Sequence, residues 1–231
     1  MQNILNNISG TKIIETSISL LVSFCFAFIV WLIKIAYEKR IKEIQLIAEI
    51  ERILSYNNGV LNDYKELLKQ WIPALKEYKA YTARFSSFNL GKDIQTTILN
   101  LDFVNVYLPV IFSLDRLESD IANIYESYSY AVKVLMSIEN QSQEQLKNWH
   151  IFNDGLLETL ERILPEVIKI QNDIIKTIAH SHVLFEQKKC SIFQIITYLN
   201  RDIYPKIRKE DITKKEESII KELEEKGIYL K

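Results

Sequence analysis

Glycine and proline are scarce in this chain of 231 residues, which contains five Gly and four Pro. Sandwiches, barrels and doubly wound sheets need many tight turns and glycine-rich loops, so this composition excludes them. The two cysteines, Cys25 and Cys190, are too few for a disulfide framework. The formal net charge of −1 argues against a strongly basic nucleic-acid-binding protein, and we expect no nucleic-acid partner. What remains is an all-α chain built from long helices.

One stretch near the N-terminus lacks charge altogether. Residues 16–33 contain no Asp, Glu, Lys or Arg, and almost all of residues 20–33 are apolar. In a helix this stretch spans roughly 27 Å, close to a hydrocarbon core of about 30 Å. A cleaved signal peptide would have a shorter apolar run and a small-residue cleavage site, and the other alternative is a buried core helix. We therefore predict a transmembrane anchor over residues 1–36, with these membrane-contacting side chains: Leu20, Phe24, Phe28, Trp31 and Lys34.

The basic residues that flank this stretch predict its orientation. The N-terminal side offers Lys12, and the other side carries Lys34, Lys39, Arg40 and Lys42. The positive-inside rule then leaves the N-terminus outside and the rest of the chain in the cytoplasm. We expect a single-pass protein of the inner (cytoplasmic) membrane, with the lipid bilayer as its first partner.

A seven-residue apolar repeat follows the anchor. In its first segment the repeat consists of Leu46, Ile50, Ile53, Asn57, Val60, Tyr64, Leu67, Trp71, Ala74, Tyr78, Tyr81, Phe85 and Phe88. Similar repeats predict three long helices over about 46–88, 93–139 and 143–187. Short connections make neighbouring helices antiparallel, so residues 37–190 are predicted to form an elongated antiparallel three-helix bundle. Within the charged tail, residues 191–231, two short helices are expected at about 192–203 and 214–226.

Each predicted long helix contains one proline: Pro73, Pro109 and Pro165. A proline inside a helix removes a backbone hydrogen bond and usually kinks the helix. If the helices fold back on one another with equal lengths, the three prolines fall at similar heights. This coincidence suggests the hypothesis of a shared hinge.

Candidate interaction residues come from three places in the repeat and the tail. Asn57 is the one polar residue of the first apolar seam, and it indicates either a buried residue that sets register or a helix break at Asn57-Asn58-Gly59. The aromatic residues that follow it favour core packing, but they would form a partner-binding surface if exposed: Trp71, Tyr78, Tyr81 and Phe85. In the tail, an amphipathic helix could dock on a partner through Ile219, Ile220 and Leu223.

The search for catalytic chemistry yields little. His150, Asp154 and Glu158 lie along one helical stripe, but this is not the Glu-x-x-His or His-Glu-x-x-His pattern that metal sites on helices use. There is no glycine-rich phosphate loop, no GxSxG motif and no Cys-x-x-Cys pair. We expect no enzyme, no metal, no cofactor and no small-molecule substrate.

Together these features favour a membrane-anchored cytoplasmic helical bundle that acts as a scaffold or interaction module. Its protein partners would be copies of itself, in a homo-oligomer, or another protein. The alternative is a membrane-perturbing effector of a bacterial toxin or antiphage defence system, in which oligomerisation clusters the transmembrane helices. Abundant Ile, Asn and Lys residues are typical of an AT-rich bacterial genome.

Overall fold

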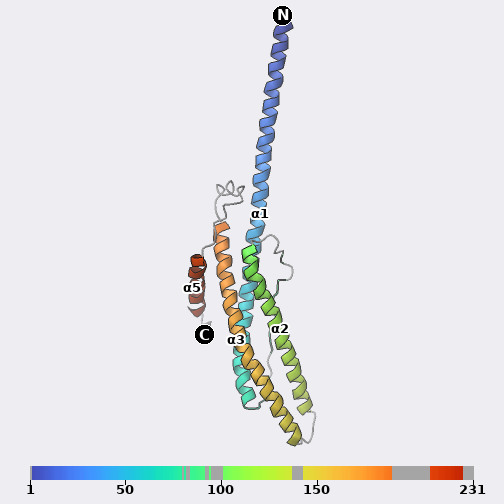
Figure 1. Cartoon of the computed structure of the whole chain (residues 1–231), viewed down its shortest axis with the longest axis vertical. Helices are drawn as coiled ribbons and strands as arrows, with labels where there is room; N and C mark the ends of the chain where they lie inside the picture. The colour runs from blue at the N-terminus through green and yellow to red at the C-terminus, as the bar shows by residue number, and fades with distance from the viewer. Residues whose placement is uncertain are drawn as a thin grey trace. The chain divides into compact units, whose positions relative to one another are not determined.

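The computed structural model describes residues 2–79, 81, 84–91, 94, 101–136, 143–188 and 209–225. The described part of the chain contains no strand, and its helices are α1 (Gln2–Lys76), α2 (Leu101–Met136), α3 (Gln143–Lys188) and α5 (Lys209–Glu225), shown in Figure 1. The predicted all-α fold class is confirmed. The short helix expected at 192–203 lies outside the described residues.

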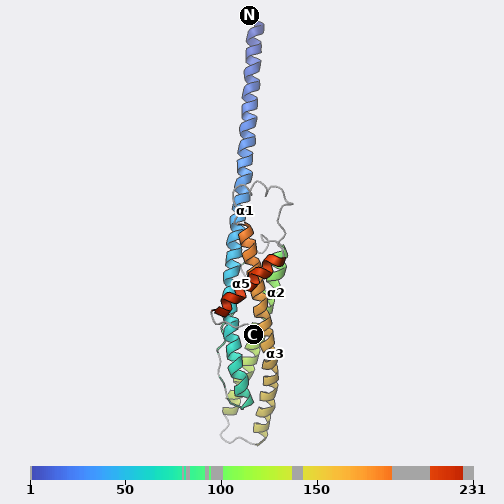
Figure 2. The same ribbon diagram turned by 90° about the vertical axis from the view of Figure 1, so that its left-hand side faces the viewer.

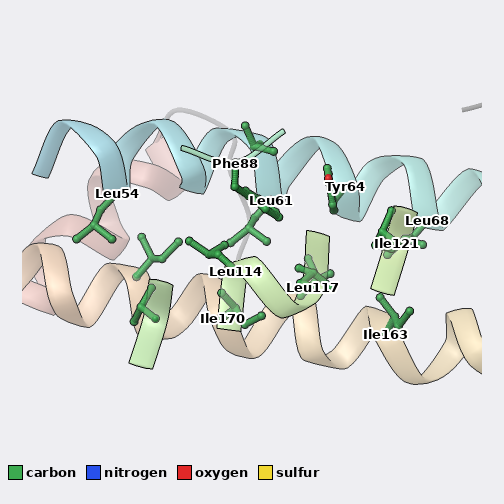
Figure 3. Close-up of a cluster of buried hydrophobic side chains, with 14 of the residues drawn as sticks. Leu54, Leu61, Tyr64, Leu68, Phe88, Leu114, Leu117, Ile121, Ile163 and Ile170 are labelled. Carbon is green, nitrogen blue, oxygen red and sulfur yellow. The ribbon is translucent and has the colours of Figure 1, made fainter. Parts of the chain in front are cut away.

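The chain divides into two compact units. Helix α1 up to Gln45 belongs to the first unit, and Leu46–Glu186 together with α5 belong to the second. The second unit contains the hydrophobic core, because the apolar seams of α1, α2 and α3 pack on one another there. Figure 3 shows this packing around Leu61, Leu114 and Ile170.

The core confirms the predicted seams of the three bundle helices. On α1, the predicted seam residues Ile50, Ile53, Val60 and Tyr64 are buried. The adjacent row of Leu54, Leu61 and Leu68 is fully buried beside them. The same rhythm of buried positions continues on α2 and α3 with Leu114, Leu117, Ile121, Leu160, Ile163, Val167 and Ile174. Apolar residues at three- and four-residue spacing form one stripe along a helix, and burial of these stripes is the main source of stability for such a bundle.

Helix α1 ends at Lys76, so the predicted extension of the first helix to residue 88 is wrong. Tyr78 adopts φ 53°, in the left-handed region. Its N–H donates to the Leu75 carbonyl at 2.9 Å, and the N–H of Lys79 donates to the Ala74 carbonyl at 2.9 Å. These two bonds form a Schellman motif, which usually has glycine at the left-handed position. A tyrosine at this position does not indicate the end of a helix in the sequence, as a glycine would.

Residues 84–91, here called the strap, run back along α1 without regular secondary structure. Tyr64 donates a hydrogen bond to the Ser86 carbonyl, and Asn57, two helical turns earlier on α1, pairs with Asn89. The chain therefore returns toward the start of the bundle before α2 begins. Because of this return, α1 and α2 run parallel: Trp71 contacts Tyr128, and earlier on both helices Ile53 and Tyr107 lie on either side of Gly91.

Helix α3 runs antiparallel to α2, as predicted, but it is also antiparallel to α1, whereas the predicted order of antiparallel neighbours makes the first and third helices parallel. Its end near His182 pairs with Glu51 of α1, and its start near Asn153 reaches Leu75. The prediction that the first and second helices are antiparallel neighbours is wrong, because the strap carries the chain back along α1. Figure 2 shows α5 crossing the side of the bundle that α1 and α3 form, and Ile219 of α5 packs against the core.

The three prolines do not occupy equivalent places in their helices. Pro73 lies in the last turn of α1, whereas Pro109 and Pro165 lie inside α2 and α3. A proline in the last turn of a helix is followed by too few helical residues to form a kink between two helical segments. The shared-hinge hypothesis therefore fails, since it required a mid-helix break in all three helices.

Candidate interaction surfaces

The first surface is the apolar stretch of α1 that was predicted as an anchor. From Glu15 to Trp31 every side chain is exposed, and the helix contains a window of mean hydropathy 2.5 that is wholly unburied. Leu20, Phe24, Phe28 and Trp31 are 68%, 73%, 49% and 53% exposed. A core helix of a water-soluble protein would bury such residues. Among the described residues this is the one helix long and apolar enough to cross a membrane.

Polar side chains follow the apolar stretch within one or two turns. Lys34 is exposed and lies 3.9 Å from Glu38, one turn further along α1. On the apolar side, the rings of Phe28 and Trp31 are in contact, with centroids 5.6 Å apart. This sequence of an aromatic pair and then a charged pair is typical of a membrane–water interface.

Asn57 is buried and makes a two-point contact with the strap. Its amide nitrogen donates to the Asn89 carbonyl at 2.8 Å, and its Oδ1 accepts the Asn89 N–H at 2.8 Å. The helix continues through Asn57-Asn58-Gly59, so the favoured interpretation of a helix break at these residues is wrong. A carboxamide that pairs with both polar groups of one peptide residue sets the position of the strap on α1.

The aromatic residues that were predicted to pack together do so, although only Trp71 lies on a helix. Trp71 is fully buried, and its ring lies 5.2 Å from Tyr128, 6.0 Å from Phe85 and 6.4 Å from Tyr81. The Tyr81 N–H donates to the Tyr128 hydroxyl at 2.8 Å. This cluster joins α1, α2 and the returning chain, so its members serve the core.

Tyr78 is the exposed member of the predicted aromatic set. It is 43% exposed, and its ring lies edge-on to His150 at a centroid distance of 4.0 Å. Its hydroxyl lies 3.4 Å from a carboxylate oxygen of Asp154. These contacts with α3 hold the end of α1 in place.

Helix α5 carries the tail residues that were predicted to interact. Ile219 and Ile220 are half-buried, and Ile219 packs against the core. Leu223 lies in the same helix. Helix α5 therefore uses its apolar side, at least at Ile219, within its own chain.

A second surface, which the sequence analysis missed, is an open groove between α2 and α3. Its wider end has a cavity volume of about 910 Å³ and is lined by Asn123, Glu126, Ser127, Tyr130, Ala131, Val134, Leu135, Gln145, Asn148, Trp149 and Phe152. A further cavity of about 390 Å³ shares Asn123 and is lined by Arg116, Asp120, Ile124, Thr159, Arg162, Ile163 and Glu166. We call the two cavities together the α2/α3 groove.

The α2/α3 groove follows a second stripe on each helix, beside the core seam. Positions 116, 120, 123, 127, 130 and 134 of α2 recur at three- and four-residue spacing, as do positions 145, 148, 152, 159, 162 and 166 of α3 when Gly155 is included. Such a stripe is visible in the sequence as spacing. An apolar repeat does not reveal this stripe, because it mixes polar and apolar residues. Its apolar residues lie at the wider cavity.

The three histidines of the bundle each contact a different residue. His150 contacts Tyr78, His180 is buried against Phe103 with ring centroids 5.5 Å apart, and His182 lies 2.5 Å from a carboxylate oxygen of Glu51. Among the residues that the structure describes, no three His, Cys, Asp or Glu side chains converge on a common point. The candidate stripe of His150, Asp154 and Glu158 is therefore not a cluster.

Two buried tyrosines have altered acidity. Burial, and secondarily the carboxylate of Glu49, raises the pKa of Tyr107 to about 12. Burial, with a contribution from Glu118, also raises the pKa of Tyr64 well above its ordinary value. Both hydroxyls therefore keep their protons to a higher pH than the hydroxyl of an exposed tyrosine does.

The chain matches no protein-family model, no curated protein and no solved structure.

Proposed function

We propose that this chain is a single-span membrane protein whose helical bundle serves as a scaffold or docking module in the cytoplasm. The observation that carries the proposal is the uninterrupted exposure of apolar side chains from Ile18 to Trp31, on the same helix that enters the bundle core at Ile47. Exposed Leu, Phe and Trp side chains in such a run are strongly unfavourable in water and favourable in lipid.

The orientation part of the proposal depends on the basic residues beside the apolar stretch. Lys34, Lys39 and Lys42 are exposed on the bundle side, and Lys12 is the one basic residue on the other side of the stretch. Basic residues close to a span are retained preferentially on the cytoplasmic side. The bundle therefore belongs in the cytoplasm and the N-terminus outside.

The docking part of the proposal is supported by the α2/α3 groove. Grooves between helices that combine apolar and amide side chains are where helical partners bind, through anchors at three- and four-residue spacing. Tyr130 is 70% exposed and Val134 is 43% exposed in the wider cavity of this groove. Exposed apolar side chains gathered in a concave site favour an interaction surface over a purely structural role.

The test is membrane fractionation of the full chain. We expect the protein to remain in the membrane pellet after extraction at high pH, and a variant lacking residues 1–35 to leave it. Phe24→Lys should weaken insertion by roughly 3 kcal/mol, because a charge near the middle of the span is costly. Phe112→Lys is the matched control, since Phe112 is 67% exposed on α2 and Phe24 is 73% exposed. Full extraction of the unaltered chain at high pH would overturn the proposal.

Orientation is tested by labelling Cys190 in a Cys25→Ser background. A membrane-impermeant maleimide should label Cys190 only after the cells are opened. Labelling of intact cells would mean that the bundle lies outside, and would contradict the cytoplasmic assignment.

The alternative function, a membrane-perturbing effector, is supported by the continuity of α1. The apolar stretch and the core residues from Ile47 to Leu75 belong to one helix without a break, so a rearrangement of the bundle can act on the span directly. Ser17, Ser19 and Ser23 are small polar residues on this stretch that can mediate helix contacts in lipid. An effector should depolarise cells when overproduced, and removal of residues 1–35 should abolish that toxicity. A scaffold should be tolerated in the same assay.

A further inference from the structure

We propose that the α2/α3 groove is a self-association surface, in which the groove of a second copy of this chain packs face to face to form a four-helix bundle. The inference rests on the proposed docking function and names its partner. Within the described residues, the other two grooves of the three-helix bundle are already in use. The strap lies between α1 and α2, and α5 crosses the α1/α3 side (Figures 1 and 2).

The geometry of the two helices suits a copy of the same pair. Helices α2 and α3 are antiparallel, as the Phe103–His180 and Tyr128–Trp149 contacts show. A two-fold axis along the bundle places α2 of one chain beside α3 of the other, and these also run in opposite directions. All neighbouring helices are then antiparallel, which is the arrangement of an up-and-down four-helix bundle.

The chemistry along the groove is self-complementary when the two copies are in register. At the narrower cavity the lining carries two basic residues, Arg116 and Arg162, and two acidic residues, Asp120 and Glu166. A second copy therefore meets equal numbers of opposite charges there, whereas a strongly acidic or basic partner would leave half of them unpaired.

At the wider cavity, the exposed side chains are also suited to contact the same residues of a second copy. Tyr130 supplies apolar area, and Asn123 and Asn148 carry carboxamides. A carboxamide both donates and accepts hydrogen bonds, so it pairs with an identical group without a charged complement. Of the described residues that line this cavity, Glu126 alone is charged. An out-of-register pairing would bury the charged end against this apolar end.

Gly155 leaves room for the second copy beside the groove: it lies on the same stripe of α3 as Phe152 and Thr159, although it lines neither cavity. It is exposed between Phe152 and Thr159, and a Cβ atom built on it meets nothing within 4 Å. Glycine inside a helix is less favourable than alanine or leucine. The missing side chain at Gly155 has no function within the single chain. It does allow a helix of the second copy to approach closely at this point.

The experiment measures the molar mass of the full chain in mild detergent by sedimentation equilibrium. We expect twice the protomer mass of 27.2 kDa. Tyr130→Glu should raise the dimer dissociation constant at least about tenfold, because it places a charge in the apolar part of the interface. Phe112→Glu is the matched control: Phe112 is 67% exposed on the same helix, against 70% for Tyr130, and lines neither cavity. A dimer that responds equally to both substitutions overturns the proposal.

A second variant separates loss of association from loss of fold. Gly155→Leu has open space around its Cβ in the single chain and is a better helix former, so its thermal midpoint should not fall. It should nevertheless weaken the dimer, because the added side chain occupies the space of the second copy. Unchanged dimerisation of Gly155→Leu contradicts a close approach at this point.

Register is tested by cross-linking two differently labelled chains in a background without Cys25 and Cys190. A mixture of Ser127→Cys and Asn148→Cys chains should cross-link through a short bismaleimide, because both positions lie at the same level. A mixture of Arg116→Cys and Asn148→Cys chains should not, since Arg116 lies roughly 16 Å nearer the start of α2 than Ser127. The reverse pattern overturns the in-register arrangement.

The two proposals fail in different ways. A chain that stays in the membrane fraction but is monomeric at concentrations of about 100 μM overturns self-association and leaves the membrane assignment standing. A monomeric chain that binds a different protein at Tyr130 would assign the groove to that protein and not to a second copy. A chain that leaves the membrane fraction overturns the proposed function itself.

Discussion

At the scale of single residues, a few polar and backbone-restricted positions decide how the chain returns after α1. Asn57 and Tyr64 bind the backbone of the strap, and Tyr78 ends the helix in a left-handed conformation. Gly91 also has a positive φ, of 55°. None of these residues belongs to a catalytic motif. Their effect is to hold irregular backbone against a helix, where its polar groups need partners.

Replacement of Asn57 by alanine should lower the free energy of unfolding by about 1–3 kcal/mol, because both polar groups of Asn89 lose their partner. Urea denaturation of the full chain in detergent measures this change. Asn62→Ala, at a half-buried position of the same helix, should cost less than about 0.5 kcal/mol. Equal losses in the two variants would mean that the Asn57 contact does not stabilise the strap.

Gly59 of α1 and Gly91 of the strap should respond oppositely to alanine. At Gly91 the positive φ is unfavourable for alanine, and its Cβ would lie 2.9–3.1 Å from side-chain atoms of Ile94, Tyr107 and Ile53. We expect Gly91→Ala to destabilise the chain by at least about 1 kcal/mol. Gly59→Ala should stabilise it by roughly 0.5–1 kcal/mol, since the site is helical and its Cβ meets nothing within 4 Å. Thermal unfolding followed by circular dichroism checks both signs, and shifts in the same direction would refute this account.

At the scale of secondary-structure elements, the long helices were predictable and their ends were less so. Helix α3, Gln143–Lys188, agrees with the predicted range of 143–187 because its apolar seam is regular and a Ser-x-x-Gln pattern precedes it. The end of α1 was missed by twelve residues, 76 against 88. Tyr81, Phe85 and Phe88 keep the helical spacing of apolar residues while lying outside any helix. Spacing alone does not separate a helix from a chain that packs along one.

The association of α5 with the bundle gives a prediction at this scale. Ile219→Ser should increase hydrogen exchange throughout residues 209–225, since loss of a half-buried isoleucine removes roughly 1–2 kcal/mol of apolar contact with the core. Lys221→Ser, at an exposed position of the same helix, is the control and should leave exchange unchanged. Identical exchange in all three proteins would show that Ile219 does not hold α5 on the bundle.

At the scale of the whole molecule, the parallel order of α1 and α2 leaves the α2/α3 groove as the open side of the bundle. In an up-and-down bundle with three equal helices, the first connection would be a short loop. Here the strap fills the groove between α1 and α2 instead, with Asn89 on Asn57 and Gly91 between Ile53 and Tyr107. The position of the candidate interaction surface is therefore a consequence of topology.

The stability of the whole bundle should fall at alkaline pH. Unfolded tyrosine releases its proton near pH 10, whereas Tyr107 holds its proton up to about pH 12 in the folded chain. Between these values the unfolded state binds fewer protons than the folded state, so the free energy of unfolding decreases as pH rises. The expected slope from Tyr107 is roughly −1 kcal/mol per pH unit, measured by urea denaturation between pH 9 and about 12. The raised pKa of Tyr64 adds to this slope in the same direction.

Phenylalanine substitutions separate the two tyrosines. Tyr107→Phe should flatten the alkaline slope and leave stability at pH 7 unchanged or higher, because the buried hydroxyl of Tyr107 has no hydrogen-bond partner among the residues that the structure describes. Tyr64→Phe should lose about 1 kcal/mol at pH 7, since the hydroxyl of Tyr64 donates to the Ser86 carbonyl at 2.8 Å. An alkaline slope that survives both substitutions would assign it to other groups.

The sequence by itself determined the helical class, the exposed apolar stretch of α1 and the side of each bundle helix that faces the core. These properties follow from local spacing: a run without charge prefers lipid, and a stripe at three- and four-residue intervals needs a partner. Only the tertiary structure decided that α1 and α2 are parallel, that Asn57 holds the strap and that the α2/α3 groove stays open. Those outcomes depend on contacts between residues about 30 or more positions apart, such as Asn57 with Asn89 and Trp71 with Tyr128. The spacing of apolar residues within one helix does not indicate which distant backbone groups will form hydrogen bonds with a buried carboxamide such as that of Asn57.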